Sequence, residues 1–274
     1  MPNNLNEALK LLNDKKYTIF AGGTDVAIEL RKATHKTDLL YVGNLKEITS
    51  IESNQNEIII GAAAKYKDII NNDKIKNFLP ALVEACSTIG AKQTRNMGTI
   101  GGNIANAAPC GDSIPPLIAY NAELELASAK GTRRFKIEDF ITGSYRTHRE
   151  YEELITKIII PKPSKRYKYG YIQLGRRGAV NITRISSLAL VSFDKNDKIE
   201  ECILAHGALF SKPGRFYYLE SLLIGQKLTE KLINSIDEKL SEIIEQEIGG
   251  RWSSEYKKPA FINICKDTLK ALMK

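Results

Sequence analysis

The sequence predicts a protein of the α+β class in two units that divide near residue 163. Short runs of β-branched and apolar residues, bounded by glycine or proline, are mixed with segments in which apolar residues recur at helical spacing. The boundary is predicted from Pro161-Lys162-Pro163, which ends a strongly β-branched run. A chain of 274 residues is long enough for two ordinary domains, which we expect to span residues 1–163 and 164–274.

The first unit is expected to begin with a short helix and then to combine strands with helices. Leu5, Leu9 and Leu12 give the first helix an apolar face, and Asn6 is in position to cap it. Further helices are expected at 25–31 and 114–120, and strands at 17–20, 39–42, 57–61, 123–128 and 154–160, with 133–137 pairing back onto 123–128.

A third helix of this unit is expected at 78–89, because Pro80 is a start signal and Gly90 a stop signal. The stretch that follows, from Gly90 to Asp112, is rich in Gly, Ala and Asn. It is too poor in large apolar side chains to predict a packed core element, and its regular glycine placement is not typical of a linker.

The second unit is expected to be a small sheet followed by helices. Strands are predicted at 167–174, 187–193 and 199–206, with a turn at 194–197. Helices are predicted at 216–223 and 228–247, and a last one from about Pro259 to Met273. In the middle helix, apolar residues recur at helical spacing at Leu228, Leu232, Ile236, Leu240 and Ile243.

Composition is that of a globular protein, with 43% hydrophobic and 26% charged residues. We find neither a run of eighteen apolar residues nor a basic N-terminal region leading into an apolar one, so we expect no membrane span and a cytoplasmic location. The net charge of +8 is most simply a lysine-rich solvated surface, and next a patch for an acidic partner or an anionic cofactor. Nucleic acid is the last choice, because no nucleic-acid-binding motif is present.

The cysteines and histidines predict neither a metal centre nor a catalytic group. The spacing of the four cysteines fits neither zinc nor an iron–sulfur cluster, so buried free thiols are expected, with Cys110 the one inside a glycine-rich region. The histidines are scattered, which favours surface or structural roles. The residues concerned are Cys86, Cys110, Cys202, Cys265, His35, His148 and His206.

The first glycine-rich turn is Ala21-Gly22-Gly23-Thr24-Asp25, between a predicted strand and a predicted helix. Glycines allow positive φ and close approach, and successive N–H groups in such a turn form a concave anion site next to a helix start. Thr24 can donate to a phosphate oxygen, whereas Asp25 is expected to cap the helix or brace the loop. The alternative is an ordinary strand-to-helix turn, since the G-x-G-x-x-G pattern is absent.

The second turn, within Gln93–Asn103, is more informative because it combines a basic residue, hydroxyls, amides and glycines. Thr99 and Asn103 can hydrogen-bond diphosphate oxygens while Gly101-Gly102 permits close backbone approach. Asp112 is a good acceptor for ribose hydroxyls. The alternative is a close-packed crossing loop in which Asp112 caps the next helix.

These segments resemble a known family. AGGTD and QTRNMGTIGGNIANAAPCGDSIPPLIAYNAEL are similar to the FAD-binding subunits of molybdenum hydroxylases, a group that includes xanthine, carbon monoxide and nicotinate dehydrogenases and 4-hydroxybenzoyl-CoA reductase. The resemblance covers almost the whole chain, with later markers at Glu153-Leu154-Ile155, Gly175-Arg176-Arg177 and Pro213-Gly214-Arg215. It implies an FAD domain of the vanillyl-alcohol oxidase (PCMH) type in two α+β subdomains. A smaller α+β domain of the carbon monoxide dehydrogenase flavoprotein C-terminal type follows.

The resemblance also implies which residues bind the cofactor. Two segments would hold the diphosphate, and Asp112 would hold the ribose. Ile89 would lie beside the flavin ring, and Ile155 or Thr156 near the adenine or the ring edge. The two diphosphate segments are Ile19, Phe20, Ala21, Gly22, Gly23, Thr24, Asp25, Val26 and Thr99, Ile100, Gly101, Gly102, Asn103. It implies no catalytic side chain and no metal ligand on this chain.

Two departures from the family pattern stand out. Many relatives carry a lysine where Tyr169-Gly170-Tyr171-Ile172-Gln173 has Ile172, and a cation there would favour an anionic reduced flavin. The cysteine-containing insertion of the benzoyl-CoA reductase branch is absent, which argues against that branch.

The function implied is electron relay. A partner with molybdopterin would oxidise the substrate, most simply xanthine or another N-heterocycle, and a partner with two [2Fe–2S] clusters would feed electrons through FAD to NAD or another acceptor. Two alternatives stay open: a stand-alone flavoprotein oxidoreductase of related fold, and a flavin-free assembly or binding protein.

Overall fold

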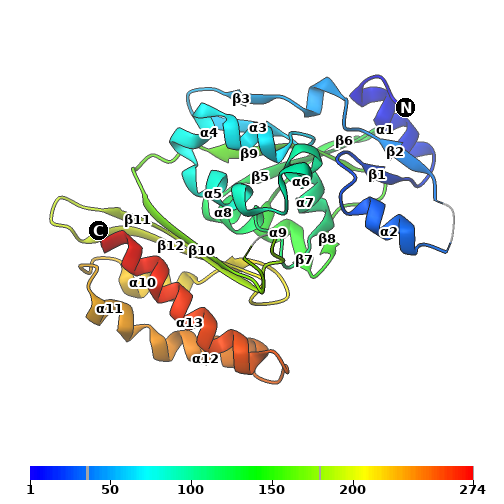
Figure 1. Ribbon diagram of the computed structural model, residues 1–274. Coiled ribbons are helices and arrows are strands. Elements are labelled where there is room, and N and C mark those ends of the chain that lie inside the picture. The colour runs from blue at the N-terminus through cyan, green and yellow to red at the C-terminus, as the bar shows by residue number, and fades with distance from the viewer. Residues whose placement is uncertain (35–36, 179, 274) are drawn as a thin grey trace.

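The computed structural model describes residues 1–34, 37–178 and 180–273 and shows an α+β fold built on two main sheets (Figure 1). His35 lies outside the described residues. A five-stranded sheet belongs to the first part of the chain and a four-stranded sheet to the second, and two-stranded sheets flank the former. The predicted α+β class is confirmed.

The N-terminal segment forms a small parallel unit at one end of the molecule. Its elements are α1 (Leu5–Asp14), β1 (Thr18–Phe20), α2 (Val26–Lys32) and β2 (Leu39–Tyr41), and β1 pairs with β2 in parallel. The apolar face of α1 packs with Leu40, Leu45 and Leu154 in a core of its own. The helix begins two residues earlier than a cap at Asn6 would place it, because the Asn4 side chain, not that of Asn6, accepts the Glu7 N–H.

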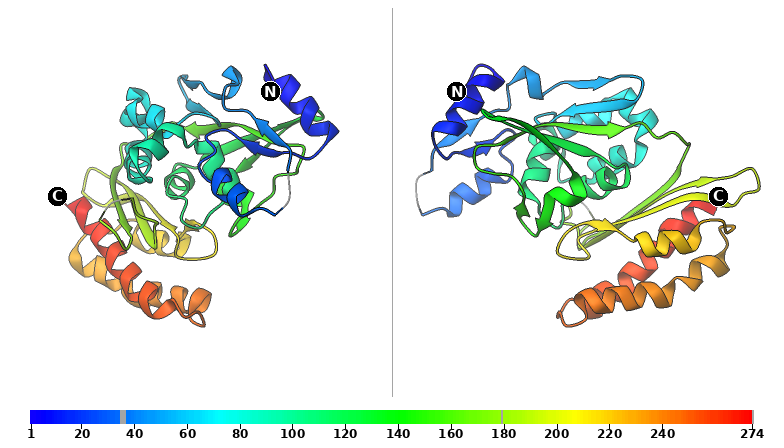
Figure 2. Two further views of the ribbon diagram at one scale, coloured as in Figure 1. Left: turned by 45° about the vertical axis from the view of Figure 1, so that its right-hand side comes forward. Right: turned by 180° about the vertical axis from the view of Figure 1, so that it is seen from behind.

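The five-stranded sheet has the order β3-β4-β9-β5-β6 and is antiparallel throughout. One face carries alternate isoleucines and leucines of β4, β5 and β9 into the largest core, and helices cover that face (Figures 1 and 2). The strands are β3 (Ile51–Ser53), β4 (Glu57–Gly61), β5 (Glu123–Ser128), β6 (Gly131–Lys136) and β9 (Leu154–Pro161), and η1 (Lys46–Ile48) precedes them.

The helices on this sheet are short and follow one another closely. They are α3 (Tyr66–Asn71), α4 (Asp73–Phe78), α5 (Pro80–Thr88), α6 (Lys92–Met97), α7 (Ile100–Asn106), α8 (Ile114–Ala119) and α9 (Ile137–Phe140), and β7 (Ile141–Gly143) pairs with β8 (Arg146–Thr147) beyond them. The helices behind Pro80 and at 114–119 were expected from the sequence, whereas α3 and α4 were not.

The expectation for Gly90–Asp112 is wrong, because this stretch forms α6 and α7 and part of it is core. Ile100 and Ile104 are fully buried in the largest core. Gly101 lies so close to β4 that a Cβ atom on it would stand 2.6 Å from the Ala62 carbonyl oxygen. The small residues therefore allow close backbone packing in place of large apolar side chains.

The four-stranded sheet has the order β10-β11-β12-β13 and lies between two layers (Figure 2). Because side chains alternate, Leu188 and Leu190 of β11 face the core of the first unit, while Ala189 and Val191 face the C-terminal helices. The strands are β10 (Lys168–Leu174), β11 (Ile185–Phe193), β12 (Ile199–Gly207) and β13 (Gly214–Arg215).

The C-terminal helices cover the outer face of this sheet. They are α10 (Tyr217–Leu223), α11 (Glu230–Ser235), α12 (Asp237–Ile248) and α13 (Ser254–Lys270), followed by η2 (Ala271–Met273). The single helix expected at 228–247 is wrong, since α11 and α12 are separated at Ile236, whose side chain nevertheless stays buried. The last helix begins at Ser254, with Pro259 at an exposed position inside it.

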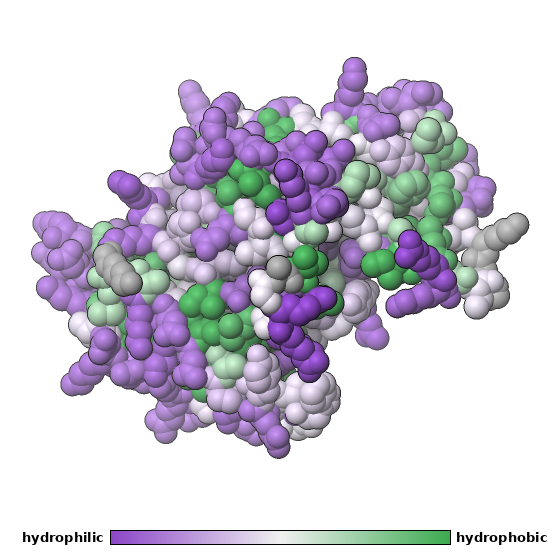
Figure 3. All heavy atoms as spheres, in the orientation of Figure 1, coloured by the Kyte–Doolittle hydropathy of each residue, from purple (hydrophilic) through white to green (hydrophobic). Residues whose placement is uncertain are grey.

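Most of the surface seen in Figure 3 is hydrophilic, with separate hydrophobic patches between charged side chains. Within the described ranges, no helix combines the length and the apolar character needed to cross a bilayer.

Candidate functional site

The first glycine turn lies at the carboxyl edge of the small parallel sheet. Because β1 and β2 run in the same direction, the turn after Phe20 lies beside the Val42–Asn44 loop, and the Val42 N–H donates to the Phe20 carbonyl at 2.9 Å. The rings of Phe20 and Tyr41 pack with their centroids 5.1 Å apart. Gly23 has a φ of +69°, a left-handed conformation that glycine adopts without strain.

The backbone donors of this turn have no protein partner among the described residues. Across the described parts of the chain, no hydrogen bond is formed by the N–H groups of residues 21–25, and these residues are not deeply buried. Successive N–H groups without a protein partner can together bind an anion. The turn is therefore chemically suited to the diphosphate that the sequence analysis predicts there.

The structure brings the two predicted turns together. A Cβ atom on Gly22 would stand 2.1 Å from the Met97 carbonyl oxygen and 2.9 Å from the Gly98 Cα, so the backbones are in direct contact. The Asn106 side-chain amide also donates to Asp25 at 3.1 Å. Asp25 therefore braces the loop against α7, and its side chain does not cap α2.

In the second turn, the backbone donors of residues 100–103 are already occupied. The N–H groups of Ile100 and Gly101 donate to the carbonyls of Ala64 and Ala62, at 3.1 and 2.8 Å. The Thr99 side chain caps α7 by accepting the Gly102 N–H at 3.2 Å, and the Asn103 N–H donates to the Thr99 carbonyl.

Side chains, together with the Thr99 N–H, which donates to no described residue, are therefore what this second turn can offer a ligand. The Thr99 hydroxyl oxygen accepts the Gly102 N–H, so the hydroxyl hydrogen can be donated to a ligand oxygen. Asn103 accepts the Ser113 hydroxyl through Oδ1 at 2.7 Å, and its amide nitrogen donates to no described residue. Gly102 is exposed, whereas the Ile100 side chain is buried in the core.

Asp112 is tied to the second unit. It is 7% exposed, and its carboxylate accepts the Thr183 hydroxyl and the Gln173 amide, the latter at 3.0 Å. Burial raises the pKa of Asp112 to about 6, and the two donors only partly offset this effect. Any ribose hydroxyl would share a carboxylate oxygen with one of these donors, so the predicted ribose contact stays a prediction.

The remaining predicted residues lie around these turns at different depths. Ile89 is half-buried at the end of α5, and its carbonyl accepts from Arg95 at 3.0 Å. Ile155, in β9, is 4% exposed within the largest core. Ile172 packs against the C-terminal helices, while its neighbour Gln173 reaches Asp112 on the opposite face of β10.

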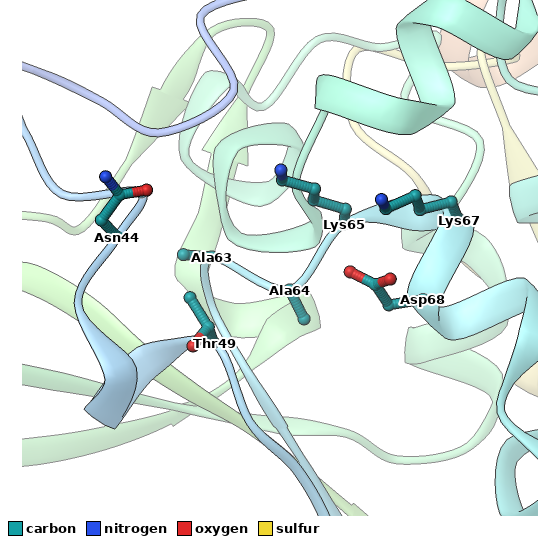
Figure 4. A pocket seen from close by; sticks show the side chains of 8 residues that line it. Asn44, Thr49, Ala63, Ala64, Lys65, Lys67 and Asp68 are labelled. Carbon is teal, nitrogen blue, oxygen red and sulfur yellow. The ribbon is translucent and has the colours of Figure 1, made fainter.

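A pocket that sequence reasoning missed opens beside the second turn. It has a volume of about 350 Å³ and is lined by Asn44, Thr49, Lys65 and Asp68 among others (Figure 4). These residues lie on separate segments, and their types are common on surfaces, so the sequence contained no signal that grouped them.

A second pocket, of about 640 Å³, lies where the two units meet. Arg176, Arg177 and Arg184 line it together with Cys110 and the exposed Trp252. Burial raises the pKa of the Cys110 thiol, with the Asp112 charge acting in the same direction, so the thiol is not activated. The Arg176-Arg177 marker thus contributes positive charge at the boundary between the units.

Residues 1–163 match the family model described as the FAD binding domain in molybdopterin dehydrogenase. The chain belongs to this family. Residues 170–272 of this FAD-binding family member match the model of the CO dehydrogenase flavoprotein C-terminal domain.

Relatives of this family member are similar along nearly their whole length. It is 37% identical to the glyceraldehyde dehydrogenase medium chain of Sulfolobus acidocaldarius, over 93% of this chain and 90% of the relative. It is 30% identical to the nicotinate dehydrogenase FAD-subunit of Eubacterium barkeri, over 97% and 92%. It is also 30% identical to the xanthine dehydrogenase FAD-binding subunit of Escherichia coli O157:H7, over 92% and 88%.

A solved structure has the same fold. A chain of carbon monoxide dehydrogenase from Hydrogenophaga pseudoflava superposes with a TM-score of 0.90 at 25% identity, covering 98% of this family member and 94% of that chain. The expected architecture, an FAD-binding domain followed by a flavoprotein C-terminal domain, is confirmed.

Proposed function

We propose that this FAD-binding chain holds the cofactor diphosphate between its two glycine turns and relays electrons in a complex with a molybdopterin subunit and a [2Fe–2S] subunit. The observation that supports the binding site is the row of unpaired N–H groups at residues 21–25, held against the second turn by the contact of Gly22 with Met97. A loop that only connected a strand to a helix would not need to leave these donors unpaired.

Each turn would contribute different groups. The N–H groups of Ala21–Asp25 and the Thr24 hydroxyl would donate to diphosphate oxygens on one side. The Thr99 hydroxyl and the Asn103 amide would donate from the other side, and exposed Gly102 would permit close approach. When bound, FAD supplies the electron transfer, from the partner's clusters to NAD or another acceptor.

No side chain of this chain is proposed as an acid, base or nucleophile. Burial among aromatic rings lowers the pKa of His206 to about 3, so its imidazole is neutral at physiological pH. The His148 ring stacks on Phe135, with centroids 5.7 Å apart. Both positions fit structural roles, which leaves binding and orientation as the work of this chain.

The substrate would be oxidised on the molybdopterin subunit, and we propose xanthine or another N-heterocycle, with NAD as acceptor. Similarity to relatives named for xanthine and nicotinate supports this class. An aldehyde is the second candidate, because the relative named for glyceraldehyde has the higher identity, 37%.

The first experiment is an absorption spectrum of the purified full chain before and after incubation with FAD. Flavin absorbance that survives desalting supports the proposal, whereas a folded, colourless chain that takes up no FAD contradicts it. Isolation of the chain with its bound partners then separates the complex from a stand-alone flavoprotein, since molybdenum and iron should be found in stoichiometric amounts. Xanthine, nicotinate and glyceraldehyde, each assayed with NAD and with an artificial acceptor, distinguish the substrate classes. A cytoplasmic location is part of the proposal, and cell fractionation tests it.

A further inference from the structure

Lys65 is a half-buried lysine whose ammonium group has no oxygen partner within the described residues. The other half-buried lysines of those ranges all reach one. Some pair with carboxylates, as Lys266 does with Asp237 at 2.7 Å, and others donate to backbone carbonyls, as Lys257 does to Ala208. The full set with partners is Lys157, Lys162, Lys165, Lys212, Lys239, Lys257, Lys258, Lys266 and Lys270.

The Lys65 ammonium lies at a pocket and forms neither an ion pair nor a hydrogen bond with a described residue, so it is available to an anionic ligand. A chain that satisfies its other half-buried lysines has no structural reason to leave this one without an oxygen. The difference indicates that the partner of Lys65 is a ligand.

The location of Lys65 restricts what that ligand can be. Lys65 pairs with Thr99 in an isolated antiparallel bridge. The flanking bonds, Tyr66 N–H to the Gly98 carbonyl and Ile100 N–H to the Ala64 carbonyl, are both 3.1 Å. This is the non-hydrogen-bonded type of pair, in which the two side chains emerge close together on the same face. The Lys65 side chain therefore begins beside the Thr99 hydroxyl that caps α7.

The ammonium extends into the 350 Å³ pocket next to this turn. Figure 4 shows Lys65 pointing across the pocket toward the side where Asn44 lies. Gly98, which the same bridge holds in place, is in backbone contact with Gly22 of the first turn. The first turn, Thr99 and Lys65 therefore lie on three segments whose backbones are in contact with one another.

We propose that Lys65 is a further cofactor-binding residue whose ammonium pairs with the diphosphate of FAD. This inference rests on the proposed function, and it adds a cation to a site whose other donors are neutral. A diphosphate carries two negative charges, and neutral N–H groups alone do not compensate them, so one ammonium at the pocket side stabilises the bound anion. Lys65 is thereby a positioning residue for the ADP half of FAD and has no direct contact with the redox ring.

The test compares Lys65→Met with Lys67→Met in the full chain stripped of flavin. Lys67 lines the same pocket but is exposed, which makes it a matched control. Flavin fluorescence during titration gives the FAD dissociation constant. We expect Lys65→Met to raise it about tenfold to a hundredfold, the range for losing one charge-assisted bond. Lys67→Met should change it less than about threefold, and Lys65→Arg should restore most of the affinity.

Two further measurements separate this inference from the proposed function. ADP has the diphosphate but no flavin. Its dissociation constant, measured by calorimetry, should differ between wild type and Lys65→Met by the same factor as that of FAD. Without any ligand, Lys65→Met should unfold at the same temperature as wild type or higher, because no native partner is lost. If the wild-type chain takes up no FAD, the proposed function fails. The other outcome is that wild type binds FAD, and that Lys65→Met either binds FAD and ADP as tightly as wild type does or is less stable than wild type without ligand. In that case the Lys65 inference is wrong and the proposed function stands.

Discussion

Gly22 is in contact with the carbonyl group of Met97, and a Cβ atom at Gly22 would stand 2.1 Å from the Met97 oxygen. This contact holds two segments that are far apart in the sequence at a fixed separation. It therefore fixes the position of the first turn, with its unpaired N–H groups, relative to the second turn, with its Thr99 hydroxyl.

Gly22→Ala should push the two turns apart, because neither side of the contact is a flexible side chain. We expect the FAD dissociation constant to rise at least about tenfold and the melting temperature to fall, since overpacking of this kind costs about 1–3 kcal/mol. Gly143→Ala is the control, because a Cβ atom there would meet no atom within 4 Å. Unchanged FAD affinity in Gly22→Ala would show that the turns do not act together.

Adjacent Gly101 and Gly102 should respond differently to substitution. A Cβ atom on Gly101 would stand 2.6 Å from the Ala62 carbonyl oxygen, so Gly101→Ala should lower the free energy of unfolding by about 1–3 kcal/mol even without FAD. Gly102 is exposed, and a Cβ atom there would come within 2.9 Å of the Thr99 hydroxyl oxygen. Gly102→Val should therefore abolish FAD retention and leave the fold largely intact.

Urea unfolding and flavin content of the two variants provide the comparison. Full retention of FAD by Gly102→Val contradicts the assignment of this turn to the cofactor. Equal loss of stability in both variants would mean that Gly102, like Gly101, serves packing.

Asp112 should make folding stability depend on pH. Burial raises its folded pKa from the ordinary 3.8 to about 6, so the folded chain binds the proton more tightly than the unfolded chain. The contribution of Asp112 to stability is then fully present below its unfolded pKa and is lost as pH rises through about 6. We expect the free energy of unfolding of wild type, relative to Asp112→Asn, to fall by up to about 3 kcal/mol between pH 4 and 7. Urea unfolding at four pH values measures this difference, and a constant value across the range would contradict it.

Arg215, which belongs to the late family markers, forms a buried ion pair with Glu220. The guanidinium donates to both carboxylate oxygens, at 3.0 and 2.8 Å, and Glu220 also accepts the Leu204 N–H. Arg215→Met would leave a carboxylate of 6% side-chain exposure without its cation, which should cost about 3 kcal/mol in urea unfolding. Lys239→Met removes a pair with Glu242 in which the two side chains are 44% and 51% exposed, and it should change little. Similar small effects from both substitutions would mean that solvent reaches the Arg215 pair.

The sequence was informative where a local pattern determines structure. Alternating and β-branched runs predicted the strands of both sheets, since burial on one or both faces leaves such patterns. Pro80 marked the start of α5 because proline fits the first turn of a helix. The two glycine turns could be found because glycines at close spacing permit positive φ and close backbone approach.

The sequence was uninformative where distant segments meet. Nothing in Ala21–Asp25 indicates that Met97 lies against it, or that Lys65 pairs with Thr99. Asp112 is adjacent to a turn in sequence, but its partners Gln173 and Thr183 come from the other unit. The packed helices within Gly90–Asp112 were missed because their contacts rely on the absence of a side chain, which hydrophobic periodicity does not register. The division near residue 163 stays a prediction.

The position of Leu188 and Leu190 in the core of the first unit limits how this chain can be recombined with its relatives. A hybrid gene that joined residues 1–163 to the C-terminal half of another family member would replace one wall of that core as well as a neighbouring domain. Such chimaeras should fold well only when the inward side chains of the grafted β11 and β12 match in volume those that they replace. The two halves are therefore expected to have diverged as a matched pair, with substitutions on one side compensated on the other.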